Sequence, residues 1–178
     1  MLNRLNTTHR KTSSTFYKVR LFYVWLNTPS DKILHSKAFM TRVDFYILPD
    51  DYHQSPLVYA SRLIEKVYRL GHGVYVHLEN EQDTQYLNEQ LWQFSPESFV
   101  PHEIVGQQQP DTPVLLGFGN EPQQHGNVMI NLSGNIPNFF SRFERVAEIV
   151  PGNKEMRTKS RENFRFYKER GYPLHTHN

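Results

Sequence analysis

The sequence predicts an α/β fold, a single domain whose mainly parallel sheet is flanked by helices. Short runs rich in β-branched and aromatic residues alternate with segments of helical periodicity, which is typical of parallel strands joined by right-handed helical crossovers. The runs at 113–118 and 127–132 are almost continuously apolar, as expected for central strands covered on both faces. With 178 residues, the chain has a one-domain length that can bury a substantial core.

The first predicted strand spans 43–48 and ends at the turn signal Pro49-Asp50-Asp51. Ser55-Pro56 then supplies an N-cap and a first-turn proline for a helix, whose apolar residues recur at three- and four-residue steps. Gly71 is expected to end this helix, because glycine readily adopts the backbone conformation that follows a helix. The run at 74–78 predicts the second strand.

A second helix is expected after Asn80, with acidic residues in its first turn that favour the positive end of the helix dipole. The C-terminal tail His175-Thr176-His177 is expected to be solvated rather than to bind a metal ion. Between the second helix and this tail, the sequence predicts a short strand at 102–105 and two longer strands at 113–118 and 127–132. A short helix opened by Pro137 follows and holds Phe139, Phe140 and Phe143. The segment at 145–150 is either a continuation of that helix or a further strand, and a last helix runs from about Asn153 to Arg170, closed by Gly171.

An aromatic joint at 91–102 connects the second helix to the next strand. It places Trp92, Phe94, Phe99 and Val100 between or beside two prolines, whereas such a connection is ordinarily small and polar. The joint is therefore either a buried corner or an exposed surface for a partner. On residue chemistry alone the buried corner is favoured, because apolar side chains usually belong to the core.

Charge is unevenly distributed along the chain. Residues 1–39 carry seven Lys or Arg and one acid, whereas 40–178 carries thirteen basic and seventeen acidic residues, a net charge of −4. Residues 71–141 contain no Lys or Arg, and 142–178 has a net charge of +4. The body is therefore acidic with a basic C-terminal quarter, which argues against a long groove that follows a nucleic-acid backbone.

Residues 1–39 differ from the rest in being polar, basic and nearly free of acids. Such a leader is either a transit peptide or an upstream extension of a reading frame that begins at Met40. We favour the second interpretation, because Met40 stands just before the first predicted strand. The expected organisation is a poorly structured N-terminal extension over 1–39 and one α/β domain over 40–178.

Catalytic and cofactor chemistry finds little support in the sequence. The chain has no cysteine, which excludes disulfides, thiolate metal sites and a cysteine nucleophile. Gly71-His72-Gly73 follows a helix and lacks a third glycine, so it predicts a helix end rather than a nucleotide-binding loop. No pair among the nine histidines has a convincing metal-ligand spacing. His102 could serve as a general base, but a structural hydrogen-bonding role is favoured. We therefore expect no catalytic residue, no metal and no cofactor.

The last predicted helix carries a second candidate surface. Arg157, Arg161, Phe164 and Lys168 lie at i, i+4, i+7 and i+11, so three cations and one ring share a helix face. A solvated charged face is the plain alternative. A helix rich in arginine and aromatic residues is nevertheless suited to grip a carboxylate while an apolar side chain inserts beside it. Single-stranded nucleic acid is the competing ligand.

Several stretches carry a family resemblance, and the block Ser98-Phe99-Val100-Pro101-His102 after Trp92 is the most specific of them. The matching stretches are 43–48, 66–72, 87–92, 96–102, 113–116, 130–132, 139–146, 148–150 and 167–172. On these, residues 40–178 resemble the chi subunit of bacterial DNA polymerase III holoenzyme over essentially their whole length. Members of that family usually begin at the first strand, which supports Met40 as the start.

The resemblance implies a Rossmann-like α/β domain without a nucleotide, and a non-catalytic adaptor in the polymerase clamp-loader complex. It implies two binding surfaces. Trp92 and Phe99 match the residues that bind the psi subunit, which changes the interpretation of the aromatic joint to an interface. The residues that match the group binding the C-terminal tail of single-stranded DNA-binding protein are Val150, Arg157, Arg161 and Phe164.

The partners that the resemblance implies are the psi subunit, the tail of single-stranded DNA-binding protein, and a helicase as an alternative occupant of the psi-side surface. Nucleic acid would be reached only indirectly, no membrane is involved, and the expected location is the cytoplasm. Phe164 stands where the family more usually has tyrosine, and Asn163 where a basic residue is common, so tail affinity is expected to be weaker or to depend differently on salt. The alternatives left open are a nucleotide-binding or enzymatic domain and a direct binder of single-stranded DNA.

Overall fold

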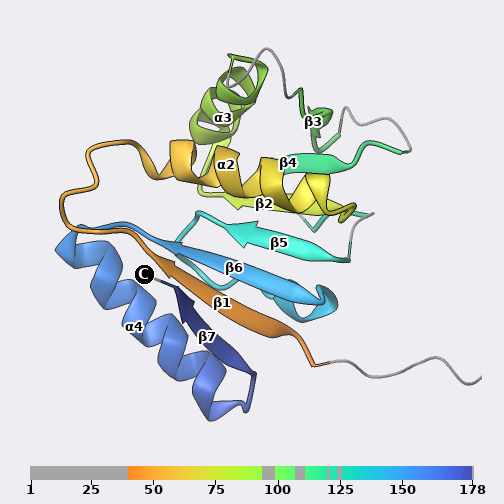
Figure 1. Cartoon of the computed structure of the whole chain (residues 1–178). Coiled ribbons are helices and arrows are strands. Elements are labelled where there is room, and N and C mark those ends of the chain that lie inside the picture. The colour runs from red at the N-terminus through yellow and green to blue at the C-terminus, as the bar shows by residue number, and fades with distance from the viewer. Residues whose placement is uncertain (1–39, 94–98, 107–110, 120, 124–125, 178) are drawn as a thin grey trace, which may run out of the picture. The chain divides into compact units, whose positions relative to one another are not determined.

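The computed structural model describes residues 40–93, 99–106, 111–119, 121–123 and 126–177. Its strands form one seven-stranded sheet in the order β3-β4-β2-β5-β6-β1-β7, and every pair of neighbours is parallel (Figure 1). The elements are β1 (Arg42–Ile47), α2 (Pro56–Arg69), β2 (Val74–Leu78), α3 (Glu81–Gln93), β3 (His102–Ile104), β4 (Val114–Phe118), β5 (Val128–Asn131), the 3₁₀ turn η2 (Phe140–Arg142), β6 (Arg145–Val150), α4 (Lys154–Glu169) and β7 (Leu174–His177). The predicted single α/β sheet domain is confirmed.

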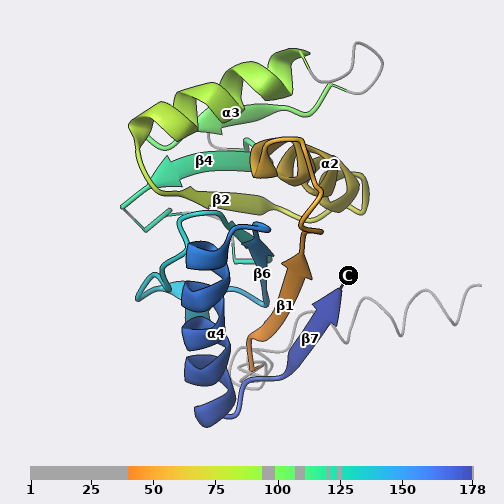
Figure 2. The ribbon, with the colours of Figure 1, turned by 90° about the vertical axis from the view of Figure 1, so that its left-hand side faces the viewer.

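Each face of the sheet has its own core, because alternate residues of a strand point to opposite sides. On one face, Ile64 of α2 and Leu87 of α3 are fully buried against the strands. On the other, Tyr167 of α4 and Phe143 pack with residues of β1, β2 and β6. The views in Figures 1 and 2 place α4 at the end of the sheet that carries β1 and β7, and α3 at the opposite end beside β3 and β4.

The helix ends follow the predicted local chemistry. The Ser55 side chain accepts a hydrogen bond from the Leu57 N–H at the start of α2, and Asn153 caps α4 by accepting from the Met156 N–H at 2.8 Å. Gly71 follows α2 with a φ of 81°, a conformation that side chains with a Cβ rarely adopt. The prediction that this glycine-rich segment ends a helix is confirmed.

The tail at 175–177 is exposed, as the sequence predicts, but it is also an ordered strand, which the sequence does not predict. These residues belong to β7, which pairs with β1 at the edge of the sheet. The His177 ring stacks on Tyr46 at 4.6 Å between centroids, and its Nε2 atom donates to the buried Asp44 carboxylate at 2.8 Å. These contacts join residues more than 130 positions apart, so the local sequence pattern does not reveal them.

Two other predictions are refined by the structure. The segment at 145–150, which the sequence left as a continuation or a strand, is the strand β6. The short helix expected after Pro137 is limited to the 3₁₀ turn η2, because the backbone is already extended at Phe143 and leads into β6. The extension at 1–39 lies outside the described residues, so the proposed domain boundary stays a prediction. Among the described helices, none combines the length and apolar character needed to cross a membrane.

Candidate functional site

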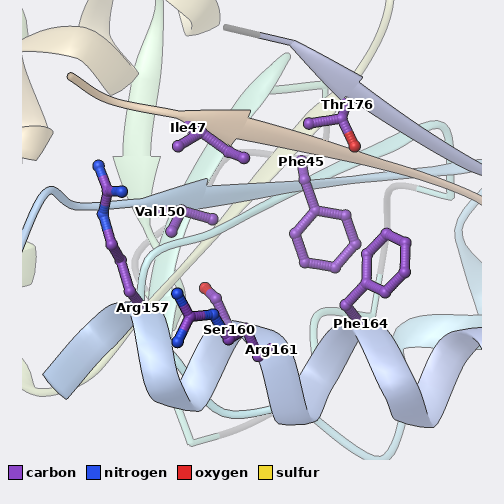
Figure 3. A pocket seen from close by; sticks show the side chains of 8 residues that line it. All are labelled: Phe45, Ile47, Val150, Arg157, Ser160, Arg161, Phe164 and Thr176. Atoms are coloured by element: carbon purple, nitrogen blue, oxygen red, sulfur yellow. The ribbon is translucent and has the colours of Figure 1, made fainter. Parts of the chain in front are cut away.

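The main candidate site is a pocket of about 220 Å³ between α4 and the end of the sheet formed by β6, β1 and β7 (Figure 3). The structure brings all four predicted tail-binding residues together in it. Its lining residues are Phe45, Ile47, Val150, Arg157, Ser160, Arg161, Phe164 and Thr176. Lys168, the fourth residue of the predicted helix face, is exposed and is not part of the lining.

The fold explains how separate segments meet at this pocket. Phe45 and Ile47 alternate along β1 and therefore face the same side of the sheet. Val150 is the last residue of β6, and only three residues separate it from the start of α4. The three- and four-residue spacing along α4 then directs its lining residues to one face of the helix. Thr176 comes from β7, which sequence reasoning had placed in a solvated tail.

One end of the pocket is apolar. The Phe45 and Phe164 rings lie 5.3 Å apart between centroids with a tilt of 57°, a favourable arrangement for two aromatic rings. Phe45 and Val150 are almost fully buried, whereas Phe164 is only partly buried at the mouth. This end can receive an apolar side chain from a ligand.

The other end of the pocket is cationic, with Arg157 and Arg161 directed away from the two aromatic rings (Figure 3). The Nη2 atom of Arg157 donates to the Leu48 carbonyl oxygen at 3.2 Å and also contacts the Asp50 carboxylate. Its Nε atom is buried and has no hydrogen-bond partner among the described residues. Arg161 is exposed, and no carboxylate in the described part of the chain forms an ion pair with it. Both guanidinium groups line the pocket, and the donors of Arg161 are available to an anionic ligand.

A buried carboxylate, Glu148 of β6, joins the sheet to α4. The Tyr167 hydroxyl donates to it at 2.8 Å, and the Asn131 amide donates to both of its oxygens at 3.0 and 3.1 Å. Burial raises the pKa of Glu148 to about 7, although hydrogen bonds from Asn131, Tyr167 and Asn163 oppose the rise. Because Glu148 is only 2% exposed, its contacts are those of a structural link rather than of a catalytic acid open to substrate.

The second candidate surface is the aromatic joint at the end of α3. Trp92 and Phe99 are 60% and 51% exposed, and their rings lie 5.0 Å apart. Val100 is buried, so only part of the joint belongs to the core, and Phe94 lies outside the described residues. Two large aromatic side chains side by side on the surface form a patch that a partner could cover.

His102 supports this surface from beneath. Its ring is 5.3 Å from the Trp92 ring and is itself 5% exposed. Its Nδ1 atom lies 2.7 Å from the Val100 carbonyl oxygen and its Nε2 atom 3.3 Å from that of Asn88. The prediction of a structural hydrogen-bonding histidine is confirmed. Among the described residues, no group of three or more His, Cys, Asp or Glu side chains is arranged to hold a metal ion.

Sequence reasoning missed four lining residues of the pocket and one neighbour. Phe45 and Ile47 were recognised only as strand residues, although their alternation on β1 could have placed them on one face. Ser160 lies three positions after Arg157 and four before Phe164, so helical spacing could have found it. Thr176 and Asp50 come from the edge strand and from a turn, and no local signal in the sequence links either of them to α4.

Comparison with known proteins places most of the chain in one family. Residues 40–175 match the sequence model of the family described as DNA polymerase III chi subunit, HolC. The chain is 42% identical to the DNA polymerase III subunit chi of Pseudomonas aeruginosa over 138 residues, which cover 78% of this chain and 96% of that protein. It is 31% identical to the Haemophilus influenzae subunit chi over 136 residues, with 75% and 94% covered. The Escherichia coli subunit chi is 27% identical over 146 residues, with 77% and 97% covered. The chain therefore belongs to the DNA polymerase III chi subunit family.

Proposed function

We propose that this protein is a non-catalytic adaptor subunit of the DNA polymerase III clamp-loader complex. In this role it links the complex, through the psi subunit, to the C-terminal tail of single-stranded DNA-binding protein during replication. The observation that carries the proposal is the pocket beside α4, where Val150, Arg157, Arg161 and Phe164 meet from two elements. Its combination of an apolar end and two arginines suits a peptide that ends in an apolar residue and carries carboxylates.

The proposed binding mode assigns a role to each end of the pocket. The terminal apolar side chain of the tail enters between Phe45, Val150 and Phe164, where burial of an aromatic ring is favourable. Arg161, which has no ion-pair partner among the described residues, binds the terminal carboxylate or an adjacent aspartate. Arg157 offers a second guanidinium at the same end, so the site is suited to a ligand with more than one negative charge.

Removal of either the Arg161 guanidinium or the terminal carboxylate of the peptide is expected to weaken tail binding by about 10- to 100-fold. The reason is that hydrogen bonds between charged groups contribute about 1.5–3 kcal/mol. The measurement is a titration of the full chain with an acidic peptide that ends in phenylalanine, beside the same peptide with an amidated C-terminus. Arg161→Ala is titrated with the free-acid peptide. Lys168→Ala is the matched control, because it removes an exposed cation from the same helix outside the pocket.

The titration also separates the proposed function from its alternatives. A free-acid peptide that fails to bind the folded protein would contradict the assignment of this pocket. Direct binding of single-stranded DNA would instead show a steep salt dependence, about 0.7 log units of affinity per log unit of salt for each phosphate contacted. Equal losses in Arg161→Ala and Lys168→Ala would indicate general attraction to a basic helix rather than a specific carboxylate site.

The surface formed by Trp92 and Phe99 is proposed to bind psi, or a helicase in its place. Trp92→Ala is expected to weaken psi binding by about 30-fold or more, as for a central aromatic residue of an interface. It should leave the melting temperature nearly unchanged because the side chain is 60% exposed. Tail-peptide affinity, measured on the same variant, should also be unchanged. Unaltered psi binding by Trp92→Ala would place that interface elsewhere.

A further inference from the structure

One carboxylate of the chain already lies against the cationic end of the pocket. The Asp50 side chain forms an ion pair with Arg157, and it reaches the guanidinium from the turn that follows β1. The same Nη2 atom also donates to the Leu48 carbonyl oxygen at 3.2 Å. In the structure, therefore, one of the two arginines that line the pocket already has a carboxylate of the protein as its partner.

The backbone fixes the position of this carboxylate. The turn at 49–52 is closed by a hydrogen bond from the Tyr52 N–H to the Pro49 carbonyl oxygen at 3.1 Å. It packs closely on the loop that leads into α4, since a Cβ atom on Gly152 would lie 2.9 Å from the Pro49 oxygen. The proximity of Asp50 to Arg157 thus follows from two packed loops rather than from a chance side-chain conformation.

The ion pair is nevertheless easy to displace. The Asp50 side chain is 79% exposed, and solvent-exposed ion pairs contribute little to stability. Arg157, by contrast, is only 30% exposed and is held additionally by the Leu48 carbonyl. The guanidinium therefore stays in place when Asp50 leaves it, and its vacated donor becomes available to another carboxylate.

We propose that Asp50 is a built-in competitor that determines which anionic ligands the pocket accepts. This inference rests on the proposed function. In the free protein Asp50 neutralises Arg157, and a ligand carboxylate must displace it. A ligand with one carboxylate is satisfied at Arg161 and leaves the Asp50–Arg157 pair intact. A ligand with two or more carboxylates engages both arginines, so Asp50 lowers the affinity for every acidic ligand while favouring those with several charges.

A competitor role and a positioning role for Asp50 predict opposite changes in peptide affinity when its carboxylate is removed. If Asp50 served to orient Arg157 for the ligand, its removal would weaken binding. As a competitor, it repels the incoming carboxylate and occupies its donor, so Asp50→Asn is expected to strengthen binding of the acidic peptide by about threefold to fivefold, the upper part of the range of an exposed ion pair. The neutral asparagine keeps the size of the side chain and the turn.

The experiment titrates the acidic phenylalanine-ended peptide into the full-length wild type, Asp50→Asn and Asp51→Asn. Asp51 is the matched control, because it is an exposed acid of the same turn that forms no ion pair with Arg157 among the described residues. We expect a gain for Asp50→Asn and less than about half of that gain for Asp51→Asn. A peptide whose only carboxylate is the terminal one should gain much less from Asp50→Asn.

A double-mutant cycle with Arg157→Ala completes the test, since the cycle isolates the coupling between two residues in contact. The gain from Asp50→Asn should disappear when Arg157 is absent. Weaker binding by Asp50→Asn, an equal gain in Asp51→Asn, or a gain that persists in the Arg157→Ala background would each overturn the inference. The wild-type titration alone tests the proposed function. If the wild type binds the peptide and Asp50→Asn shows no gain, the competitor role of Asp50 is wrong and the proposed function stands.

Discussion

Between pH 4.5 and pH 8, wild-type protein is expected to lose about 3 kcal/mol of unfolding free energy that a Glu148→Gln variant retains. Burial raises the pKa of Glu148 to about 7 in the folded protein, against an ordinary value of 4.5. Well below pH 4.5 the carboxyl is protonated in both states, so its contribution to stability is fully present. As the pH rises, the unfolded chain releases this proton first, and the stability falls until the folded-state pKa is passed.

The size of the loss follows from the pKa difference, since each unit corresponds to 1.36 kcal/mol. No discount for solvent is needed because Glu148 is 2% exposed. Glutamine does not titrate, so its curve lacks this decline. Its amide can still accept the hydrogen bond from the Tyr167 hydroxyl, but it places an NH₂ group near the Asn131 amide donor. The prediction therefore concerns the slope against pH and not the absolute stability at low pH.

Urea denaturation at several pH values measures this slope. Other titrating groups act equally in wild type and variant, so the difference between the two curves isolates Glu148. Glu144→Gln is the matched control, because Glu144 is an exposed glutamate just before β6. Parallel curves for wild type and Glu148→Gln would show that the buried carboxyl titrates at an ordinary pKa. The result matters for the pocket, because the Glu148–Tyr167 contact joins β6 to the helix that supplies both arginines.

Strands and helices whose pattern is local were predictable from the sequence. The apolar runs that became β4 and β5 are indeed central in the sheet and fully buried along most of their length. Helix α2 begins and ends where the N-cap serine and Gly71 predicted. In each case the deciding residues lie within a few positions of one another, so local pattern was sufficient.

Edge strand β7 was not predictable, because its contacts are distant in the sequence. His177 is held by Asp44 and Tyr46 on β1, and a His-Thr-His tail shows no strand pattern of its own. The same distinction applies to the pocket. Helical spacing grouped Arg157, Arg161 and Phe164, whereas nothing local joined them to Asp50 or Thr176, which reach the site only through the parallel pairing and the packed turn.

A larger side chain at position 160 is expected to weaken tail binding strongly while leaving both arginines intact. Ser160 lines the pocket on the same helix face (Figure 3), so the ring of Ser160→Phe would occupy the space between Val150 and Phe164. Burial of one apolar side chain contributes roughly 1.5–3 kcal/mol. Loss of that burial predicts a decrease in affinity for the acidic peptide of about 10- to 100-fold.

Ser160→Ala is the matched control, because it removes the hydroxyl and keeps the pocket open; its affinity should stay close to that of the wild type. The melting temperature of Ser160→Phe should not fall, since the new ring covers the exposed edge of Phe164 and buries apolar surface.

If Ser160→Phe binds the peptide as tightly as the wild type, the terminal side chain does not enter this pocket, and the arginines act by charge alone. If Ser160→Phe loses binding while Ser160→Ala keeps it, recognition requires the apolar end together with the cationic end. An arrangement of that kind would let the protein distinguish a C-terminal apolar residue from any other acidic segment, because charge attracts both ligands but only one can fill the pocket.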